Sequence, residues 1–184
     1  MVQSPFLEKL MVISEGKRGA KEFLSMSYRD YLKDIHDIPY NLFAQMEQEI
    51  GREKALAILK HAGERYGRKV GEGHVARFGK VDSFQDFKAL WHKVISTSLW
   101  IGTQDSEIVE EGVDRLSMRV TRCLWAETFK ALGDVEAGYL MCCNCDHEMV
   151  RAYSPHLRIS RTRTIMQGDD HCNHVFIWDY DIIK

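Results

Sequence analysis

Residues 115–123 read Arg-Leu-Ser-Met-Arg-Val-Thr-Arg-Cys, and this stretch alternates between apolar and polar side chains. Alternation with a period of two is typical of a β-strand that buries one face. The face expected to be buried carries Leu116, Met118 and Val120. A weaker extended segment at 106–110 precedes this strand, and Gly112 lies between the two. We expect the two segments to pair as an antiparallel hairpin.

Helical and extended patterns follow one another after this strand. We expect a short helix at 124–132 that ends at Gly133, and a longer helix at 135–153 that must end before Pro155. Two further strands are expected at 156–164 and 172–180. The Gly168-Asp169 pair between them is typical of a hairpin turn, so the C-terminal part is predicted to be antiparallel.

The chain before residue 102 has helical periodicity from about residue 6 to residue 100. Four helices are expected there: 21–35, 39–50 with Pro39 in its first turn, 55 to about 71 with its end near Gly71 and Gly73, and 84–100 capped by Ser83 with Asp86 three residues on. We therefore predict one α+β domain spanning 1–184. A helical part at about 1–102 precedes a small antiparallel sheet of about four strands with two packed helices at about 103–184.

Composition narrows the functional classes. The chain has 184 residues, of which 45% are hydrophobic and 28% charged, as in ordinary globular proteins. A net charge of -2 gives no electrostatic reason to expect a nucleic acid as partner. Charges interrupt the N-terminal residues, which therefore contain no apolar run long enough for a signal peptide or a membrane span. We expect a cytoplasmic protein that binds neither membranes nor nucleic acids.

The thiols are concentrated near the C-terminus, at Cys123, Cys142, Cys143, Cys145 and Cys172. An odd number of cysteines in a cytoplasmic protein favours reduced thiols. On a continuous α-helix, Cys143, Asp146 and His147 occupy positions i, i+3 and i+4 and share one face. A thiol beside a carboxylate and an imidazole is an arrangement that generates a nucleophilic thiolate, so these three are the candidate catalytic residues. Cys142 and Cys145 are interpreted as small core residues of the same helix.

Two other thiol chemistries are less well supported by the pattern. Cys142 and Cys145 have the spacing of a redox pair, but such pairs begin a helix and these cysteines lie in the middle of one. Ligand types suitable for zinc are present at Cys123, Cys143, Cys172, His147 and His174. The sequence lacks two compact paired clusters of ligands, so we expect no metal and no other cofactor.

The last two strands add candidates for binding. Cys172 and His174 lie on one face at the start of the last strand, beside the turn that contains Asp169. A strand end could project them into a site, although His174 also suits a structural role and Asp169 suits a turn. Arg161 lies between two other arginines on the preceding strand, and its planar fork suits a carboxylate. The alternative is an edge strand protected by charge. Surface or capping roles are expected for the four histidines of the helical half, His36, His61, His74 and His92.

Several short motifs occur in a fixed order in the C-terminal part: Thr121-Arg122-Cys123, Gly138, Cys143-Asn144-Cys145-Asp146, Arg161-Thr162-Arg163-Thr164 and Gly168-Asp169-Asp170-His171-Cys172. This ordered set resembles the L-2-amino-thiazoline-4-carboxylic acid hydrolase family over about residues 116–176. The helical part carries only a short further similarity, at 50–55. At the level of fold alone, the strand–helix–hairpin ending is also similar to the vinyl-reductase type of ligand-binding domain.

The resemblance implies a hydrolase that opens a cyclic amidine or thiazoline bearing a carboxylate. Within that chemistry we assign Cys143 as the nucleophile or as a residue that positions water, with Asp146 as its acid/base partner and His147 beside them. Residues expected to bind the substrate are Cys123, Arg161, Thr162, Asp169, Cys172 and His174. Two alternatives stay open, a non-catalytic domain that senses a small molecule and a protein with a thiol-ligated metal. The helical half also offers surface for a homodimer.

Overall fold

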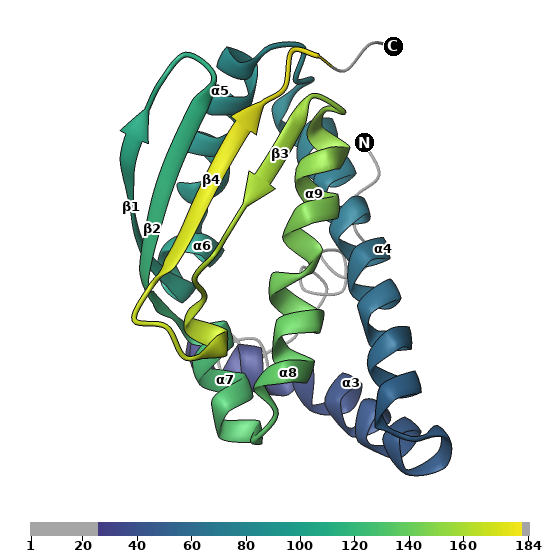
Figure 1. Cartoon of the computed structure of the whole chain (residues 1–184). Coiled ribbons are helices and arrows are strands. Elements are labelled where there is room, and N and C mark those ends of the chain that lie inside the picture. The colour runs from purple at the N-terminus through teal and green to yellow at the C-terminus, as the bar shows by residue number, and fades with distance from the viewer. Residues whose placement is uncertain (1–25, 182–184) are drawn as a thin grey trace, which may run out of the picture.

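The computed structural model describes residues 26–181 (Figure 1). The helical part consists of α3 (Tyr28–Ile50), α4 (Arg52–Phe78), α5 (Phe84–Ile95) and α6 (Ser98–Thr103). The part that follows consists of β1 (Gln104–Glu111), β2 (Arg115–Cys123), α7 (Leu124–Leu132), α8 (Val135–Gly138), the π-helix η1 (Tyr139–Cys143), α9 (Cys145–Tyr153), β3 (Leu157–Ser160), the 3-10 helix η2 (Ile165–Gln167) and β4 (Cys172–Trp178). The α+β class, with a four-stranded sheet after a helical half, is confirmed.

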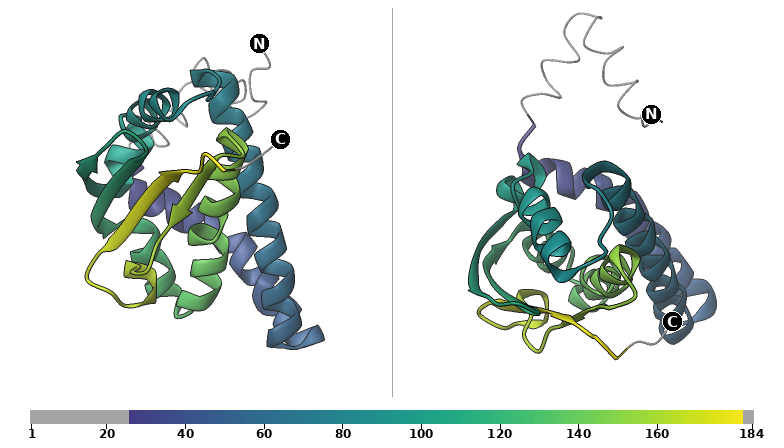
Figure 2. Two further views of the ribbon diagram at one scale, coloured as in Figure 1. Left: turned by 45° about the horizontal axis from the view of Figure 1, so that its top comes forward. Right: turned by 90° about the horizontal axis from the view of Figure 1, so that it is seen from above.

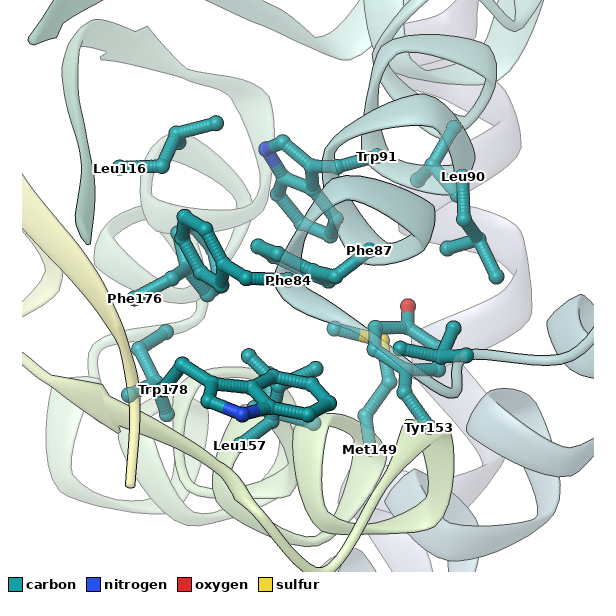
Figure 3. Close-up of a cluster of buried hydrophobic side chains, with 14 of the residues drawn as sticks. Phe84, Phe87, Leu90, Trp91, Leu116, Met149, Tyr153, Leu157, Phe176 and Trp178 are labelled. Atoms are coloured by element: carbon teal, nitrogen blue, oxygen red, sulfur yellow. The ribbon is translucent and has the colours of Figure 1, made fainter. Parts of the chain in front are cut away.

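The sheet is antiparallel throughout, with the strand order β1-β2-β4-β3. Helices α5 and α9 lie on the same side of this sheet, and α4 lies outside α9 (Figures 1 and 2). Leu116, Met118 and Val120 of β2 are buried, as their alternation predicted. Aromatic side chains fill the space between sheet and helices, and the ring centroids of Trp91 and Phe176 are 4.6 Å apart (Figure 3). The face of the sheet that is turned toward the helices is therefore closely packed.

The connection between β3 and β4 differs from the predicted hairpin. β3 ends at Ser160, because the backbone N–H groups of Thr162 and Arg163 donate to the side-chain oxygen of Asn173 at 3.0 and 2.7 Å. The chain then forms η2, which Thr164 caps, and Gly168 follows in the left-handed conformation with a φ of 106°. The expected strands at 156–164 and 172–180 were thus too long, and the residues after Ser160 are held by side chains instead of by a ladder.

Three helix boundaries in the N-terminal half were predicted wrongly. Pro39 lies inside α3 instead of beginning a helix, because the same helical face is buried on both sides of it. The expected helix at 84–100 is divided into α5 and α6 at 96–97, although Ser83 does cap α5 by accepting from the Asp86 N–H at 3.2 Å. The helix beginning at Arg52 continues through Gly71 and Gly73 to Phe78. The parts of the expected helices before residue 26 lie outside the described residues.

Close packing explains why glycines do not end α4. Gly63, Gly67 and Gly71 recur every four residues on the buried face of this helix. A Cβ atom at Gly67 would lie 2.0 Å from the carbonyl oxygen of Cys145, and one at Gly63 would lie 2.4 Å from that of Leu140. The missing side chains therefore let the backbone of α4 approach η1 and α9 more closely than any other residue would allow.

The start of α4 is tied to α8 by an ion-pair network. Arg52 donates to both carboxylate oxygens of Asp134, each at 3.0 Å, and also to Glu47 at 2.7 Å and Glu136 at 2.8 Å. Asp134 in turn caps α8 by accepting from the Ala137 N–H at 2.9 Å. This network fixes the helical half against the segment that carries the cysteines.

That segment is not the continuous α-helix expected at 135–153. The π-helix η1 interrupts it, and the Asn144 N–H donates to the Tyr139 carbonyl at 2.8 Å, five residues back. A π-helical turn contains one residue more than an α-helical turn and is common at functional sites. The extra residue changes the direction of the side chains in this segment, so Cys142, Cys143 and Cys145 all lie on the wall of the same cavity.

Candidate functional site

A cavity of about 690 Å³ lies between the sheet and the helices α3, α4, η1 and α9. Its volume is within the usual range for sites that bind small organic molecules. Most of its lining is apolar or aromatic, and representative residues are Phe43, Leu59, Trp91, Met149 and Phe176. An apolar cavity with a few polar side chains is the usual form of a small-molecule site, and those polar side chains fix the orientation of the ligand.

One cluster of charged and polar side chains joins α9 to β4 and to the segment that follows β3. Arg161 donates through Nη1 to Asp146 Oδ2 at 2.6 Å and through Nη2 to the carbonyl oxygen of Cys143 at 2.7 Å. The same Nη1 lies 2.9 Å from Nε2 of His174. All four residues line the cavity, and the Arg161 side chain is only 3% exposed. The buried guanidinium is therefore matched by a carboxylate, and the cluster carries no net charge when His174 is neutral.

Two nitrogens of this cluster lack a partner among the described residues. Because Arg161 donates to Nε2 of His174, the ring proton lies on Nδ1, and this buried N–H makes no hydrogen bond. The Nε–H of Arg161 is also buried without a partner. Burial lowers the pKa of His174 to about 4, with Arg161 acting in the same direction and Asp146 opposing it. At neutral pH the cluster thus contains two buried N–H donors without a partner among the described residues.

The thiols predicted to belong to the site are present but protonated. Cys123, Cys143 and Cys172 all line the cavity. Burial raises the pKa of Cys123 to about 11, and it raises the pKa values of Cys143 and Cys172 as well. Cys172 accepts a hydrogen bond from the Ile165 N–H at 3.3 Å, which holds the start of β4 against η2. The neutral thiol is accordingly the resting form of each.

Three residues expected in the site lie elsewhere. His147 is exposed on α9 and does not line the cavity. Thr162 accepts a hydrogen bond from the Asn173 side chain at 2.9 Å, and Asp169 accepts one from the Thr164 N–H at 2.7 Å. Thr162 and Asp169 thereby shape the connection between β3 and β4, which is the turn-forming role left open for Asp169.

Sequence reasoning missed another part of the cavity wall. Cys142 and Cys145, interpreted as core residues, both line the cavity, and Cys142 Sγ lies 3.6 Å from Nε2 of His36. The surface or capping role expected for His36 and His74 is wrong, because His36 is 8% exposed and His74 contacts the Tyr153 hydroxyl at 2.8 Å. Spacing could have indicated His36, since it lies on the same helical face as Leu32 and Phe43, which are both buried.

The described residues contain neither a cluster of metal ligands nor a membrane-spanning helix. Between residues 26 and 181, no three His, Cys, Asp or Glu side chains converge as a set of metal ligands would. Within the same range, no helix combines the length and the apolar character that a membrane span requires.

The chain was compared with known proteins in sequence and in fold. No curated protein matches the chain in sequence. The fold is similar to that in the crystal structure of the phenol-responsive sensory domain of the transcription activator PoxR with phenol. The TM-score is 0.50, and the match covers 80% of this chain and 74% of that one at 11% identity, so the likeness concerns the fold alone. The model of the L-2-amino-thiazoline-4-carboxylic acid hydrolase family matches residues 33–176, and the chain therefore belongs to this family.

Proposed function

We propose that the protein hydrolyses a small, carboxylate-bearing cyclic amidine or thiazoline in the cavity, with Asp146 as the acid/base residue. The observation that carries the proposal is the position of Asp146 on a mostly apolar wall. Oδ2 of this carboxylate accepts from Arg161, whereas the one contact of Oδ1 among residues 26–181 is with the Cys145 sulfur at 4.0 Å. Oδ1 is thus in a position to accept a proton and to return it to a leaving nitrogen or sulfur.

The substrate carboxylate is assigned to the two donors without partners. Arg161 Nε–H and His174 Nδ1–H are buried, and leaving each unsatisfied costs about 1–3 kcal/mol. A carboxylate that accepts from both would recover this cost, which is why Arg161 remains the expected anchor although Asp146 already matches its charge.

Of the two roles considered for Cys143, positioning the reactants suits the geometry better than direct attack. Its sulfur has no hydrogen bond to a base among residues 26–181. Its carbonyl oxygen instead accepts from Arg161, so Cys143 helps to orient the guanidinium beside Asp146.

The test is turnover of a panel of cyclic amidine and thiazoline carboxylates, followed by chromatography of the ring-opened products. Asp146→Asn keeps the shape of the side chain and removes the proton acceptor, so the rate should fall by about 10²–10⁴-fold. Asp170→Asn is the matched control, because Asp170 is 71% exposed and lies outside the cavity, and its rate should not change. Full activity of Asp146→Asn would exclude Asp146 as the acid/base residue.

A second candidate is a domain that binds a small neutral molecule without converting it. It is favoured by the charge balance of the site, since Asp146 already compensates Arg161 and most of the wall is apolar. The similar fold of a phenol-responsive sensory domain is consistent with this reading. Calorimetric titration with phenol and with a cyclic amidine carboxylate separates the two candidates. A sensor would bind phenol and release it unchanged, whereas the hydrolase would bind the carboxylate and open its ring.

A further inference from the structure

Cys142 and His36 form a thiol–imidazole pair on the cavity wall. The two residues are 106 positions apart in the sequence, and they meet because α3 crosses beside η1. Their sulfur and Nε2 atoms are 3.6 Å apart, within the range for a hydrogen bond to sulfur. Both side chains line the cavity that holds Asp146 and Arg161. The pair is therefore accessible to the same ligand as the charged cluster.

The tautomer of His36 is fixed by its other ring nitrogen. Nδ1 lies 2.7 Å from the carbonyl oxygen of Leu32, and because a carbonyl only accepts, Nδ1 must carry the proton. Nε2 is then unprotonated and faces the thiol of Cys142. Trp125 and Phe129 contact the ring edge to face, with centroids at 5.3 and 5.1 Å, so its orientation is fixed as well. A nucleophile, a base and a group that orients the base are the three parts of an activated nucleophile.

The resting state of the pair is neutral. Burial raises the pKa of Cys142 and lowers the pKa of His36, while the bond to Leu32 opposes the shift of His36. A neutral imidazole can accept the thiol proton as the sulfur attacks, without an ion pair being formed beforehand. Cys143, the next residue along the chain, has no base hydrogen-bonded to its sulfur among the described residues. The geometry thus distinguishes two adjacent thiols.

We infer that Cys142 is the nucleophile of this cavity and that His36 is its base. The inference deepens the proposed function, on which it rests, by naming the group that attacks the substrate. The ligand class is a small heterocycle with an electrophilic sp² carbon between two heteroatoms, as in a cyclic amidine or a thiazoline.

Each step of such a reaction balances with water as the co-reactant. The Cys142 sulfur forms a bond to the sp² carbon, its proton moves to His36 Nε2, and the C=N electron pair moves to the ring nitrogen. An electron pair on a remaining heteroatom then re-forms the double bond as the bond to the leaving nitrogen or sulfur breaks. The leaving atom takes up the proton that His36 holds, directly or through Asp146, so that His36 is neutral again and the opened ligand stays attached to Cys142. Water attacks the same carbon as its proton moves to His36, and the Cys142 sulfur leaves and takes that proton back from His36 as a thiol.

The pair can be tested by thiol labelling without a substrate. Iodoacetamide should alkylate Cys142 before the other four cysteines, as peptide mapping by mass spectrometry would show. His36→Asn retains a donor where Nδ1 meets the Leu32 carbonyl and removes Nε2, so alkylation of Cys142 should slow by about a hundredfold. His61→Asn is the matched control, because His61 is 76% exposed, bonds to Glu64 and does not line the cavity that holds the thiols. First reaction at another cysteine, or an unchanged rate in His36→Asn, would overturn the inference.

The pH profile of the unmodified protein gives a second test that needs no variant. A thiol assisted by His36 should react faster as the imidazole loses its proton and then reach a plateau, since the pKa of His36 lies below the ordinary value of 6.5. An unassisted thiol whose pKa is raised would instead become tenfold more reactive for each pH unit over the whole range up to about pH 9, with no plateau, and that profile would contradict the role of His36.

Turnover separates failure of this inference from failure of the proposed function. If the protein opens a member of the substrate panel and Cys142→Ser does so at the same rate, the proposed function stands and Cys142 is not the nucleophile. If the protein opens none of them, the proposed function fails, and a reactive Cys142 that depends on His36 would still establish the pair as a nucleophilic site. If the protein opens none of the substrates and Cys142 is labelled slowly and independently of His36, both the proposed function and the nucleophilic pair are excluded.

Discussion

The two polar ends of the cavity differ in charge and in how they are held. The cluster of Asp146, Arg161 and His174 contains a buried ion pair and connects α9 to β4 and to the segment after β3. The pair of Cys142 and His36 is neutral and consists of one contact between η1 and α3. Changes at the charged end should therefore alter stability as well as chemistry, whereas changes at the neutral end should alter chemistry and have a smaller effect on stability.

The largest loss of stability is expected from Gly67→Ala, because it separates α4 from α9, and both helices form part of the cavity wall. The added Cβ would lie 2.0 Å from the carbonyl oxygen of Cys145, so α4 and α9 must move apart. Overpacking of this kind costs about 3 kcal/mol, as urea unfolding would measure. Gly73→Ala on the same helix meets no atom within 4 Å and should stabilise the protein by up to about 1 kcal/mol. Equal effects of the two substitutions would contradict the close packing of α4.

This packing also shows what local sequence signals cannot predict. Gly71 and Pro39 are ordinary helix boundary signals, yet both lie inside helices because tertiary contacts of α3 and α4 outweigh local preference. The strand at 115–123 was predicted correctly, since alternate burial leaves a direct trace in the sequence. Helix boundaries that depend on packing against a neighbouring helix cannot be predicted from the local sequence pattern.

The site divides in the same way. Cys143, Asp146, Arg161 and His174 were among the residues predicted for the site from the C-terminal part of the chain, and they line one cavity. His147, Thr162 and Asp169 belonged to the same prediction and do not line it. The partner of Cys142 could not be predicted, because it requires the crossing of α3 beside η1 and the extra residue of the π-helical turn.

Arg161→Met tests the charged end and is expected to cost about 2 kcal/mol. Methionine retains the length of the apolar stem but leaves the Asp146 carboxylate, which is 24% exposed, without its cation. The partial exposure of Asp146 is the reason for expecting less than the cost of a fully buried pair. Arg158→Met is the control, because its bond to Asp179 lies at the surface, and it should change stability by less than about 0.5 kcal/mol.

The stability of the charged end should also depend on pH through His174. Its pKa is about 4 in the folded protein and 6.5 in the unfolded chain, so the unfolded chain binds a proton first as the pH falls. The free energy of unfolding should then decrease by about 1.4 kcal/mol between pH 7.5 and pH 5.5, as denaturant midpoints at each pH would show. His174→Asn removes the titrating group and should reduce this slope. An unchanged slope would mean that other histidines with lowered pKa values, such as His36 and His74, account for it.

The smallest effect on stability is expected from His36→Asn, at the neutral end. The variant keeps the donor to the Leu32 carbonyl and loses the edge-to-face contacts with Trp125 and Phe129, so it should cost about 0.5–1 kcal/mol. It changes no charge at neutral pH, because burial lowers the pKa of His36. Urea unfolding of this variant, set beside its loss of Cys142 alkylation, measures stability and reactivity in one protein. A loss of stability equal to that of Arg161→Met would show that the thiol–imidazole contact also holds the fold together, and the contrast between the two ends would then disappear.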